Sequence, residues 1–360
     1  MKNLSKNTVA ALFLTVLLFT LAVPQSFAGG QNAGDSGAKP DEITIQLKWL
    51  PQAQFMGYYV AAAKGYYEDE GLKVNIVPGG GDITETNAVY SGQVDVGVTW
   101  VSNLIVARAN GLDLIDVAQI YQRSGLVLVA KKDSGVASGK DIVNATRVGN
   151  WMGGNEYEIK ALFNVLPGVD NDKALIQQGF DMNDFDNGNI TAASAMTYNE
   201  LGLVINSYEG ALGYGGRVNI IDMNTEGVAM LEDCMFVKES WAKANRDKLV
   251  RFIRASLKGW QEACANPDEA AEIVFRAGSS VSAPHQRYMA SEVAKLVTVD
   301  TKGNPVPPDS LGGFDVEAME STLAKTKSYA GLTDSSKNTV LQALNVNQIY
   351  DPSYWEEAVR

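Results

Sequence analysis

Four large aromatic side chains each follow a short strand-like segment of this 360-residue chain, at points where β-strands are expected to end. These residues are Trp49, Trp100, Trp151 and Tyr198. Open α/β sheets bind ligands at the carboxyl ends of their strands, and aromatic faces placed there can stack on a planar ring. A single tryptophan in such a place usually belongs to the core. Four at equivalent strand ends favour a stacking pocket over packing alone.

The polar side chains near the same strand ends are mostly neutral or acidic. They are Asn103, Asn155, Glu156, Asn199 and Glu200, with Asp82 and Asp233 as further candidates, and Lys48 and Arg123 as exceptions. An anionic ligand such as a sulfonate, nitrate or phosphate would need cationic partners. A flat, neutral or cationic heterocycle fits better, because a carboxylate accepts hydrogen bonds from a ring N–H and an exocyclic amine. For Glu200 the alternative is a helix-start carboxylate that only complements the helix dipole.

We predict a ligand-binding set without any catalytic or metal-binding residue. Its members are Trp49, Gln54, Tyr58, Asp82, Trp100, Asn103, Trp151, Asn155, Glu156, Tyr198, Glu200 and Asp233. One His and two Cys are too few for most zinc sites, which use about four ligands. Gly79-Gly80-Gly81-Asp82 lacks the Gly-Lys-Ser/Thr of a P-loop, so it is either a glycine-rich turn near the ligand or an ordinary tight turn. Residues 181–186 resemble a calcium loop but have Asp186 where glycine is required, and the isolated His285 is expected to pack or lie at the surface.

Alternating strand-like and helix-like segments predict an α/β fold with parallel-rich sheets. Strand-like runs occupy 43–47, 74–77, 94–98, 126–130, 147–150 and 192–196, with helical patterns between them. The order of turn, strand and aromatic residue in 92–100 returns in 188–198, which indicates a weak structural repeat and two lobes. From residue 239 the chain is mostly helical, apart from a Pro- and Gly-rich loop at 301–313. Cys234 and Cys264 form either a disulfide or, slightly favoured, two buried free thiols.

The N-terminal segment has the features of a secretory signal peptide. Lys2 and Lys6 precede an apolar run at 9–23, and Ser26-Phe27-Ala28 is a small-x-small cleavage site. The run is shorter than the roughly 20 residues of a spanning helix, and no Cys at the cleavage site offers a lipid attachment. We expect 1–28 to be removed, 29–41 to be a flexible linker, and the mature protein to be periplasmic. A net charge of −12 without basic runs argues against a nucleic-acid partner.

Several motifs, taken together, resemble the substrate-binding proteins of ABC importers, in the branch related to thiamine-pyrimidine synthases. They are Lys48-Trp49-Leu50-Pro51, the runs from Gly57 to Tyr67 and from Glu70 to Leu72, and Ser91-Gly92-Gln93-Val94-Asp95-Val96-Gly97. Segments 151–158, 196–201 and 227–233 resemble that family's importers of formyl-aminopyrimidine or riboflavin. The resemblance covers residues 42–267. It implies a two-lobed periplasmic-binding-protein fold (type II) that closes on a ligand between its lobes, with a C-terminal helical extension.

The resemblance also implies a domain division and a function. Residues 42–130 and 223–360 would form lobe 1, and 131–222 lobe 2. The protein would be a monomer without cofactor or enzymatic activity that passes a planar vitamin-like heterocycle to an inner-membrane ABC permease and its ATPase. Neither formyl-aminopyrimidine nor riboflavin is singled out.

Two other functions stay open. One is the family's enzyme branch, which makes the thiamine pyrimidine from its own His and a cofactor, with iron and a Cys-rich loop. This chain departs from that branch, because Phe55 or a neighbour replaces the His expected after the Trp-x-Pro motif, and Cys234 alone remains of the loop. The other is a sensor lobe for a separate membrane kinase.

Overall fold

The computed structural model describes residues 39–166 and 175–360, and the chain from Pro40 onward forms one compact unit. The predicted signal peptide and most of the predicted linker lie outside the described residues. The first strand already begins at Asp41, the last residue of that linker. Among the described residues, no helix combines the length and the apolar character needed to cross a membrane.

The first sheet is mixed and has the strand order β2-β1-β3-β10-β4. β1 pairs in parallel with β2 and β3, and β10 runs antiparallel to β3 and β4, so four of the five strands point the same way. The bounds are β1 (Asp41–Gln46), β2 (Leu72–Val77), β3 (Val96–Trp100), β4 (Leu114–Gln119) and β10 (Asp233–Lys238). Parallel neighbours require crossover connections, and helices supply them here.

The second sheet has the order β7-β6-β8-β5-β9, and β5 is its antiparallel strand. Its strands are β5 (Leu126–Lys131), β6 (Val148–Asn150), β7 (Leu175–Gln177), β8 (Ala192–Met196) and β9 (Val218–Asp222). Position by position this order repeats the first sheet, with β6 in the place of β1, β7 in that of β2 and β8 in that of β3. The shared topology agrees with the repeat expected from the sequence and with an α/β fold of two parallel-rich sheets.

The chain passes from the first sheet to the second between β4 and β5, and returns between β9 and β10. β5 pairs with β8 and β9, so residues 126–130 lie in the second sheet and the lobe boundary expected at residue 130 is wrong for this strand. The sequence misleads here because an apolar run does not reveal which sheet it joins. β9 ends at Asp222, the last residue expected for lobe 2.

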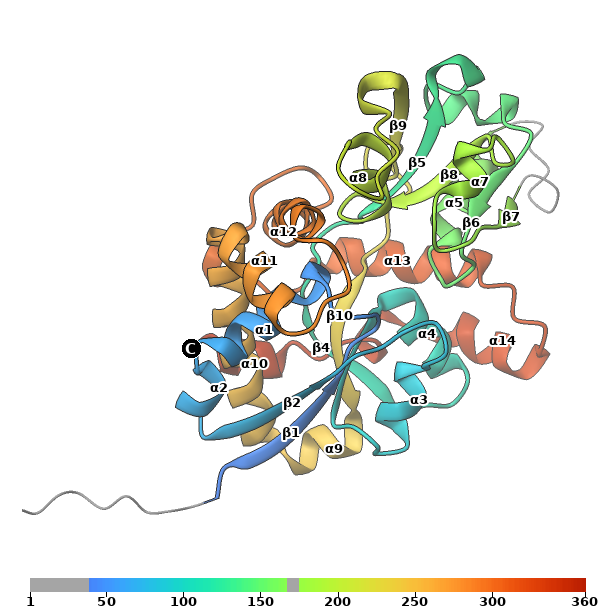
Figure 1. The fold of residues 1–360 in the computed structure, drawn as a ribbon. Coiled ribbons are helices and arrows are strands. Elements are labelled where there is room, and N and C mark those ends of the chain that lie inside the picture. The colour runs from blue at the N-terminus through green and yellow to red at the C-terminus, as the bar shows by residue number, and fades with distance from the viewer. Residues whose placement is uncertain (1–38, 167–174) are drawn as a thin grey trace, which may run out of the picture. The chain divides into compact units, whose positions relative to one another are not determined.

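Helices cover both sheets (Figure 1). Those of the first half are α1 (Met56–Ala63), α2 (Tyr66–Asp69), α3 (Glu85–Tyr90), α4 (Val101–Ala109), α5 (Glu156–Asn164), α7 (Asn183–Asp186) and α8 (Glu200–Ile205). Those of the second half are α9 (Glu239–Ala244), α10 (Arg246–Ala265), α11 (Pro267–Arg276), α12 (Ala283–Thr298), α13 (Val316–Tyr329), α14 (Ser335–Ala343) and α15 (Ser353–Ala358). Short 3-10 turns lie at Ala53–Phe55, Lys132–Ser134, Gly139–Asn144, Gly215–Arg217, Pro308–Ser310 and Val346–Gln348.

The C-terminal helices contact both halves of the molecule. α10 packs on α1 and α2 beside the first sheet, whereas α13 contacts both α4 and α5, and α12 contacts α8. Figure 1 shows α13 running between the two sheets. α5 and α8 follow strands of the second sheet. The expected division, which assigns all of 223–360 to lobe 1, therefore does not account for the contacts that α12 and α13 make with the second sheet's helices.

The core around α10 follows from its amphipathic pattern. Leu249, Phe252, Ile253, Leu257 and Trp260 recur at helical spacing, and all five are at most 4% exposed. Burying each such side chain contributes about 1.5–3 kcal/mol. α1 and α10 approach closely because both carry glycine at the crossing, where a Cβ on Gly259 would come within 2.2 Å of the Gly57 carbonyl oxygen. Cys264 of α10 and Cys234 of β10 are both free thiols.

Candidate ligand-binding site

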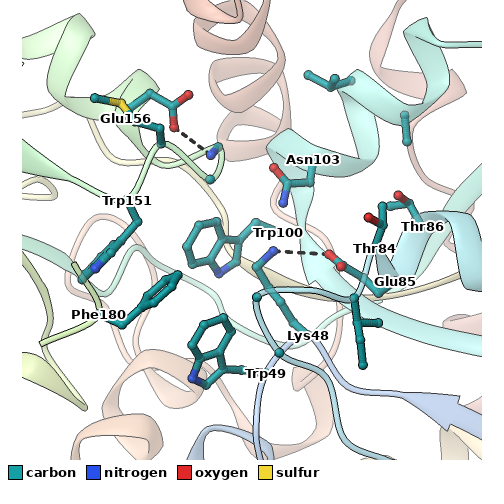
Figure 2. A pocket seen from close by; sticks show the side chains of 18 of the residues that line it. Lys48, Trp49, Thr84, Glu85, Thr86, Trp100, Asn103, Trp151, Glu156 and Phe180 are labelled. Carbon is teal, nitrogen blue, oxygen red and sulfur yellow. Dashed lines mark hydrogen bonds and ion pairs between the residues drawn. The ribbon is translucent and has the colours of Figure 1, made fainter. Parts of the chain in front are cut away.

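A cleft of about 950 Å³ lies where the strand ends of the two sheets face each other. Eight of the twelve residues predicted for the site line it, namely Trp49, Gln54, Trp100, Asn103, Trp151, Glu156, Tyr198 and Glu200. Figure 2 shows aromatic side chains on one side of the view and the Lys48–Glu85 pair near the centre. The shared topology explains the convergence, because β1, β3, β6 and β8 bring their carboxyl ends to facing edges.

All four strand-end aromatic residues reach this cleft. Trp49 follows β1 and Trp100 is the last residue of β3 in the first sheet, and Trp151 and Tyr198 follow the equivalent β6 and β8 of the second. Tyr198 is only 3% exposed and meets Tyr121 edge-on at 6.0 Å, so it forms part of the wall as well as the core. Their contact with a ligand stays a prediction.

The Lys48 ammonium is held within the cleft wall. Its Nζ lies 3.3 Å from Glu85 Oε1 and 4.4 Å from the centre of the Trp100 ring. Thr99 donates a further hydrogen bond to the same Glu85 oxygen. A cation already paired with a carboxylate and an aromatic face has less to offer an anionic ligand.

Glu200 is 7% exposed and already has protein donors. Its Oε2 accepts from the Met196 backbone N–H at 2.9 Å, and its Oε1 accepts from Asn199 Nδ2 at 2.8 Å. Burial raises the pKa of Glu200 to about 7, and these hydrogen bonds oppose the rise. The residue is therefore a helix-start carboxylate as well as a cleft residue, and its proton occupancy changes near neutral pH.

Glu156 is held in a similar way at the start of α5. It is 8% exposed, and its Oε2 accepts from the Gly154 backbone N–H at 2.7 Å. Lys48 and Lys337 are the cations among the described lining residues, against the carboxyl groups of Glu85, Glu156 and Glu200. The charge balance of this cleft suits a neutral or cationic ligand better than an anion.

The floor of the cleft is a chain of amides that ends on a buried carboxyl. Gln52 Nε2 donates to Gln54 Oε1 at 2.9 Å, and Gln54 Nε2 donates to Asp233 Oδ2 at 2.9 Å. Burial raises the pKa of Asp233 to about 7, which the Gln54 hydrogen bond and the Lys48 charge oppose. Asp233 therefore positions Gln54 and does not itself line the cleft.

Three more of the predicted residues lie elsewhere. Tyr58 is completely buried in α1 and packs edge-on against Trp260 at 5.5 Å, so it is a core residue. Asp82 is exposed and does not cap α3, which begins at Glu85 with Thr84 as its N-cap. Glu85 forms no capping box with Asp82, although the two residues have the spacing for one, because its carboxyl group bonds Lys48 and Thr99 instead. Asn155 is 3% exposed and lies behind the cleft wall.

Phe180, Gln52, Lys48 and Glu85 line the cleft but are absent from the predicted set. Phe180 follows β7, a strand of three residues that gives almost no periodic signal. Recognising β7 would have placed Phe180 at the same sheet edge as Trp151. Lys48 is the neighbour of Trp49, Gln52 lies two residues before Gln54, and Glu85 is the first residue of α3.

The two sheet crossings meet behind the cleft at a cluster of buried carboxyl groups. Ser124, after β4, has its Oγ 2.9 Å from Glu158 Oε2 on α5 and 3.1 Å from Glu232 Oε1, just before β10. A hydroxyl carries one proton, so Ser124 cannot donate to both carboxylates at once. Burial and the nearby charge of Asp233 raise the pKa of Glu232 to about 8. Burial and the charge of Glu232 likewise raise the pKa of Glu158.

His285 packs inside the protein, which is one of the two roles expected for it, the other being a place at the surface. It is 3% exposed, contacts the Tyr208 hydroxyl through Nδ1, and lies 2.9 Å from Asn199 Oδ1 through Nε2. Burial lowers its pKa to about 4, so the ring is neutral near neutral pH. Asp181 of the calcium-like stretch bonds Asn183, and in the described residues no three His, Cys, Asp or Glu side chains are grouped to hold a metal ion.

Solved structures place this architecture among periplasmic binding proteins. The periplasmic aliphatic sulphonate-binding protein SsuA of Escherichia coli matches with a TM-score of 0.64 and 14% identity, over 87% of this chain and 93% of that one. A model of the NMT1/THI5-like family matches residues 52–270. The chain belongs to this family.

Two relatives in sequence are named as binding proteins. Riboflavin-binding protein RibY of Chloroflexus aurantiacus is 27% identical over 72% of this chain and 75% of its own length. The formylaminopyrimidine-binding protein of Halalkalibacterium halodurans is 23% identical over 79% of this chain and 84% of its own. A 4-amino-5-hydroxymethyl-2-methylpyrimidine phosphate synthase of Saccharomyces cerevisiae is 26% identical, over only 30% of this chain.

Proposed function

We propose that this chain is the periplasmic solute-binding protein of an ABC importer, and that it binds a planar vitamin-like heterocycle in the cleft between its two sheets. The observation that carries the proposal is the convergence of Trp49, Trp100, Trp151 and Tyr198 from equivalent strands of the two sheets on one cleft. Rings at facing edges can stack on a flat ligand from both sides. The relatives named for riboflavin and formylaminopyrimidine support this ligand class.

The cleft favours the larger of the two ligands. Its volume of about 950 Å³ lies near the upper end of the range of about 300–1,000 Å³ for sites that hold drug-sized molecules. A three-ring flavin with a polar side chain fills such a space better than a single pyrimidine ring. The carboxyl groups of Glu156 and Glu200 and the amides of Gln52 and Gln54 would then take the ring N–H and carbonyl groups.

Synthesis of a thiamine pyrimidine is the alternative function. The His-dependent chemistry implied by the family's enzyme branch finds no partner in the described cleft lining, which contains neither His nor Cys. His285 is buried among Tyr208, Asn199 and Tyr288. The partial match to the synthase, against far longer matches to binding proteins, also supports a transport role without catalysis.

The rest of the proposal follows from the sequence and the family. Lys2, Lys6, the apolar run at 9–23 and the site at Ser26-Phe27-Ala28 support export to the periplasm. We propose that the mature protein acts as a monomer and delivers its ligand to a membrane permease driven by an ATPase.

Mass spectrometry of small molecules that co-purify with the exported protein tests the proposal. We expect one aromatic heterocycle at about one molecule per chain, and riboflavin is the first candidate. A purified protein carrying a sulfonate, or one that converts added precursors into a pyrimidine, would overturn it.

A further inference from the structure

One exposed aromatic side chain bridges the mouth of the cleft. Phe180 is 64% exposed, and its ring centre lies 4.9 Å from that of Trp49 at an interplanar angle of 51°. Phe180 follows β7 of the second sheet, whereas Trp49 follows β1 of the first. Figure 2 shows Phe180 between Trp151 and Trp49. The contact therefore joins the two sheet edges within the lining of the cleft.

The backbone that carries Phe180 is fixed to the second sheet. Gln178 donates its backbone N–H to the Asn150 carbonyl at 2.8 Å, and its side chain bonds both the N–H and the carbonyl of Ser194. Trp151 Nε1 donates to the Gly179 carbonyl at 3.0 Å. Because the backbone at Gln178 and Gly179 is held in this way, Phe180 stays with the second sheet and moves with it.

The opposite side of the contact is the glycine segment 79–81 of the first sheet. This segment follows β2, the counterpart of β7, so the two loops are topologically equivalent. A Cβ on Gly79 would come within 2.2 Å of the Leu47 carbonyl oxygen, so the segment lies flat against the chain that leads to Trp49. A Cβ on Gly81 would lie 3.7 Å from the Phe180 ring, which therefore rests close above a side-chain-free surface.

A second contact between the two halves lies on another part of the cleft wall. Gly154, after β6, approaches Asn103 of α4 so closely that a Cβ would come within 2.1 Å of Asn103 Oδ1. The neighbouring Gly153 faces Trp100. Glycine at these positions allows the two halves to touch. Phe180 adds a large side chain to the contacts between them.

We propose that Phe180 is the lid of the site: its ring packs on Trp49 and on the 79–81 surface, covers the bound heterocycle and sets how fast the ligand leaves. The proposal rests on the proposed function, because it needs a ligand in this cleft. Affinity differences between related complexes lie mostly in the dissociation rate, and removing a covering aromatic ring acts there.

The test compares F180A and F180L with F275A in the otherwise unchanged mature chain. Phe275 of α11 is 45% exposed and lines no part of the cleft, so F275A is the matched control. Stopped-flow emission follows dissociation of riboflavin and, separately, of formyl-aminopyrimidine. We expect F180A to speed dissociation about tenfold, equal to 1.4 kcal/mol, with an association rate within about threefold of wild type. The dissociation rate of F180L should lie between those of wild type and F180A, and that of F275A should match wild type.

Acrylamide quenching of tryptophan emission gives a second readout that needs no ligand. F180A should make Trp49 more accessible and raise the quenching constant, and F275A should leave it unchanged. If wild type binds a heterocycle but F180A and F275A release it equally fast, the lid is wrong while the proposed function stands. If wild type binds neither compound, the proposed ligand class fails, and unchanged quenching in F180A would overturn the Phe180–Trp49 contact as well.

Discussion

Replacing Glu200 by Gln should remove a pH dependence from ligand binding. Burial raises the pKa of Glu200 to about 7, and the carboxyl group lines the cleft. A heterocycle that donates a ring N–H to this group binds its ionised form. Affinity should therefore rise with pH through 7 and level off above it. Because Gln cannot ionise, the part of the pH dependence that comes from residue 200 should disappear in E200Q.

The size of the effect follows from the pKa. With a pKa of about 7, the ionised fraction of Glu200 is about 3% at pH 5.5 and about 97% at pH 8.5. Wild-type affinity should therefore be about 30-fold higher at the upper pH, or about 2 kcal/mol. At the upper pH, E200Q should bind at least about tenfold more weakly than wild type, because one acceptor has become a donor.

The stability of the ligand-free protein should respond to pH in the opposite direction. A carboxyl group whose pKa is raised on folding stabilises the fold fully below its unfolded pKa, and this stability is lost as pH rises through about 7. The melting temperature of E200Q should therefore fall less than that of wild type between about pH 5 and pH 8. Opposite signs for binding and folding separate a ligand contact from a helix-start role.

Isothermal titration calorimetry of wild type and E200Q with riboflavin at both pH values measures the binding effect. Burial also raises the pKa of Asp233 to about 7, so the informative quantity is the difference between the two proteins. Equal pH slopes in wild type and E200Q would refute the reasoning and leave Glu200 as a residue that only organises the start of α8.

Three further changes have defined outcomes. Trp151→Ala should weaken ligand binding by about 1–3 kcal/mol by analogy with base stacking, measured by fluorescence titration, whereas Trp151→Phe keeps a ring and should lose less. E232Q should reduce the fall in melting temperature between about pH 5 and pH 8, because the raised pKa of Glu232, about 8, makes its stabilising contribution disappear as pH rises; an unchanged pH profile by calorimetry would contradict this. Gly79→Ala should cost about 1–3 kcal/mol of unfolding free energy in a denaturant titration, since its Cβ meets the Leu47 carbonyl, and wild-type stability would disprove the close approach.

Residues that follow clear strands could be placed from the sequence. The strand-like runs before Trp49, Trp100, Trp151 and Tyr198 are visible in the sequence, and the rule that ligands bind at strand carboxyl ends then brings the four residues to one cleft. Tyr58 could not be separated from them. It lies in the family-like run from Gly57 to Tyr67, but its helix turns it toward Trp260 in the core.

Short or fully buried strands limited the rest. β7 has three residues, so the strand-end rule never reached Phe180. All six residues of β4 are buried, including Asp116, and a strand buried on both faces shows no alternation of polar and apolar residues. β5 joins the second sheet because it pairs with β8 and β9. These partners are distant in sequence, so the local sequence of β5 does not reveal which sheet it joins.

A crystal structure of the mature protein with riboflavin, and one with formyl-aminopyrimidine, tests the central claim most directly. We expect the ring system of the true ligand between the two sheets, in stacking contact with at least one of Trp49, Trp100 and Trp151, and with a ring N–H directed at Glu200 or Glu156. A ligand bound away from all three tryptophans, or held by Lys48 through an anionic group, would contradict the account.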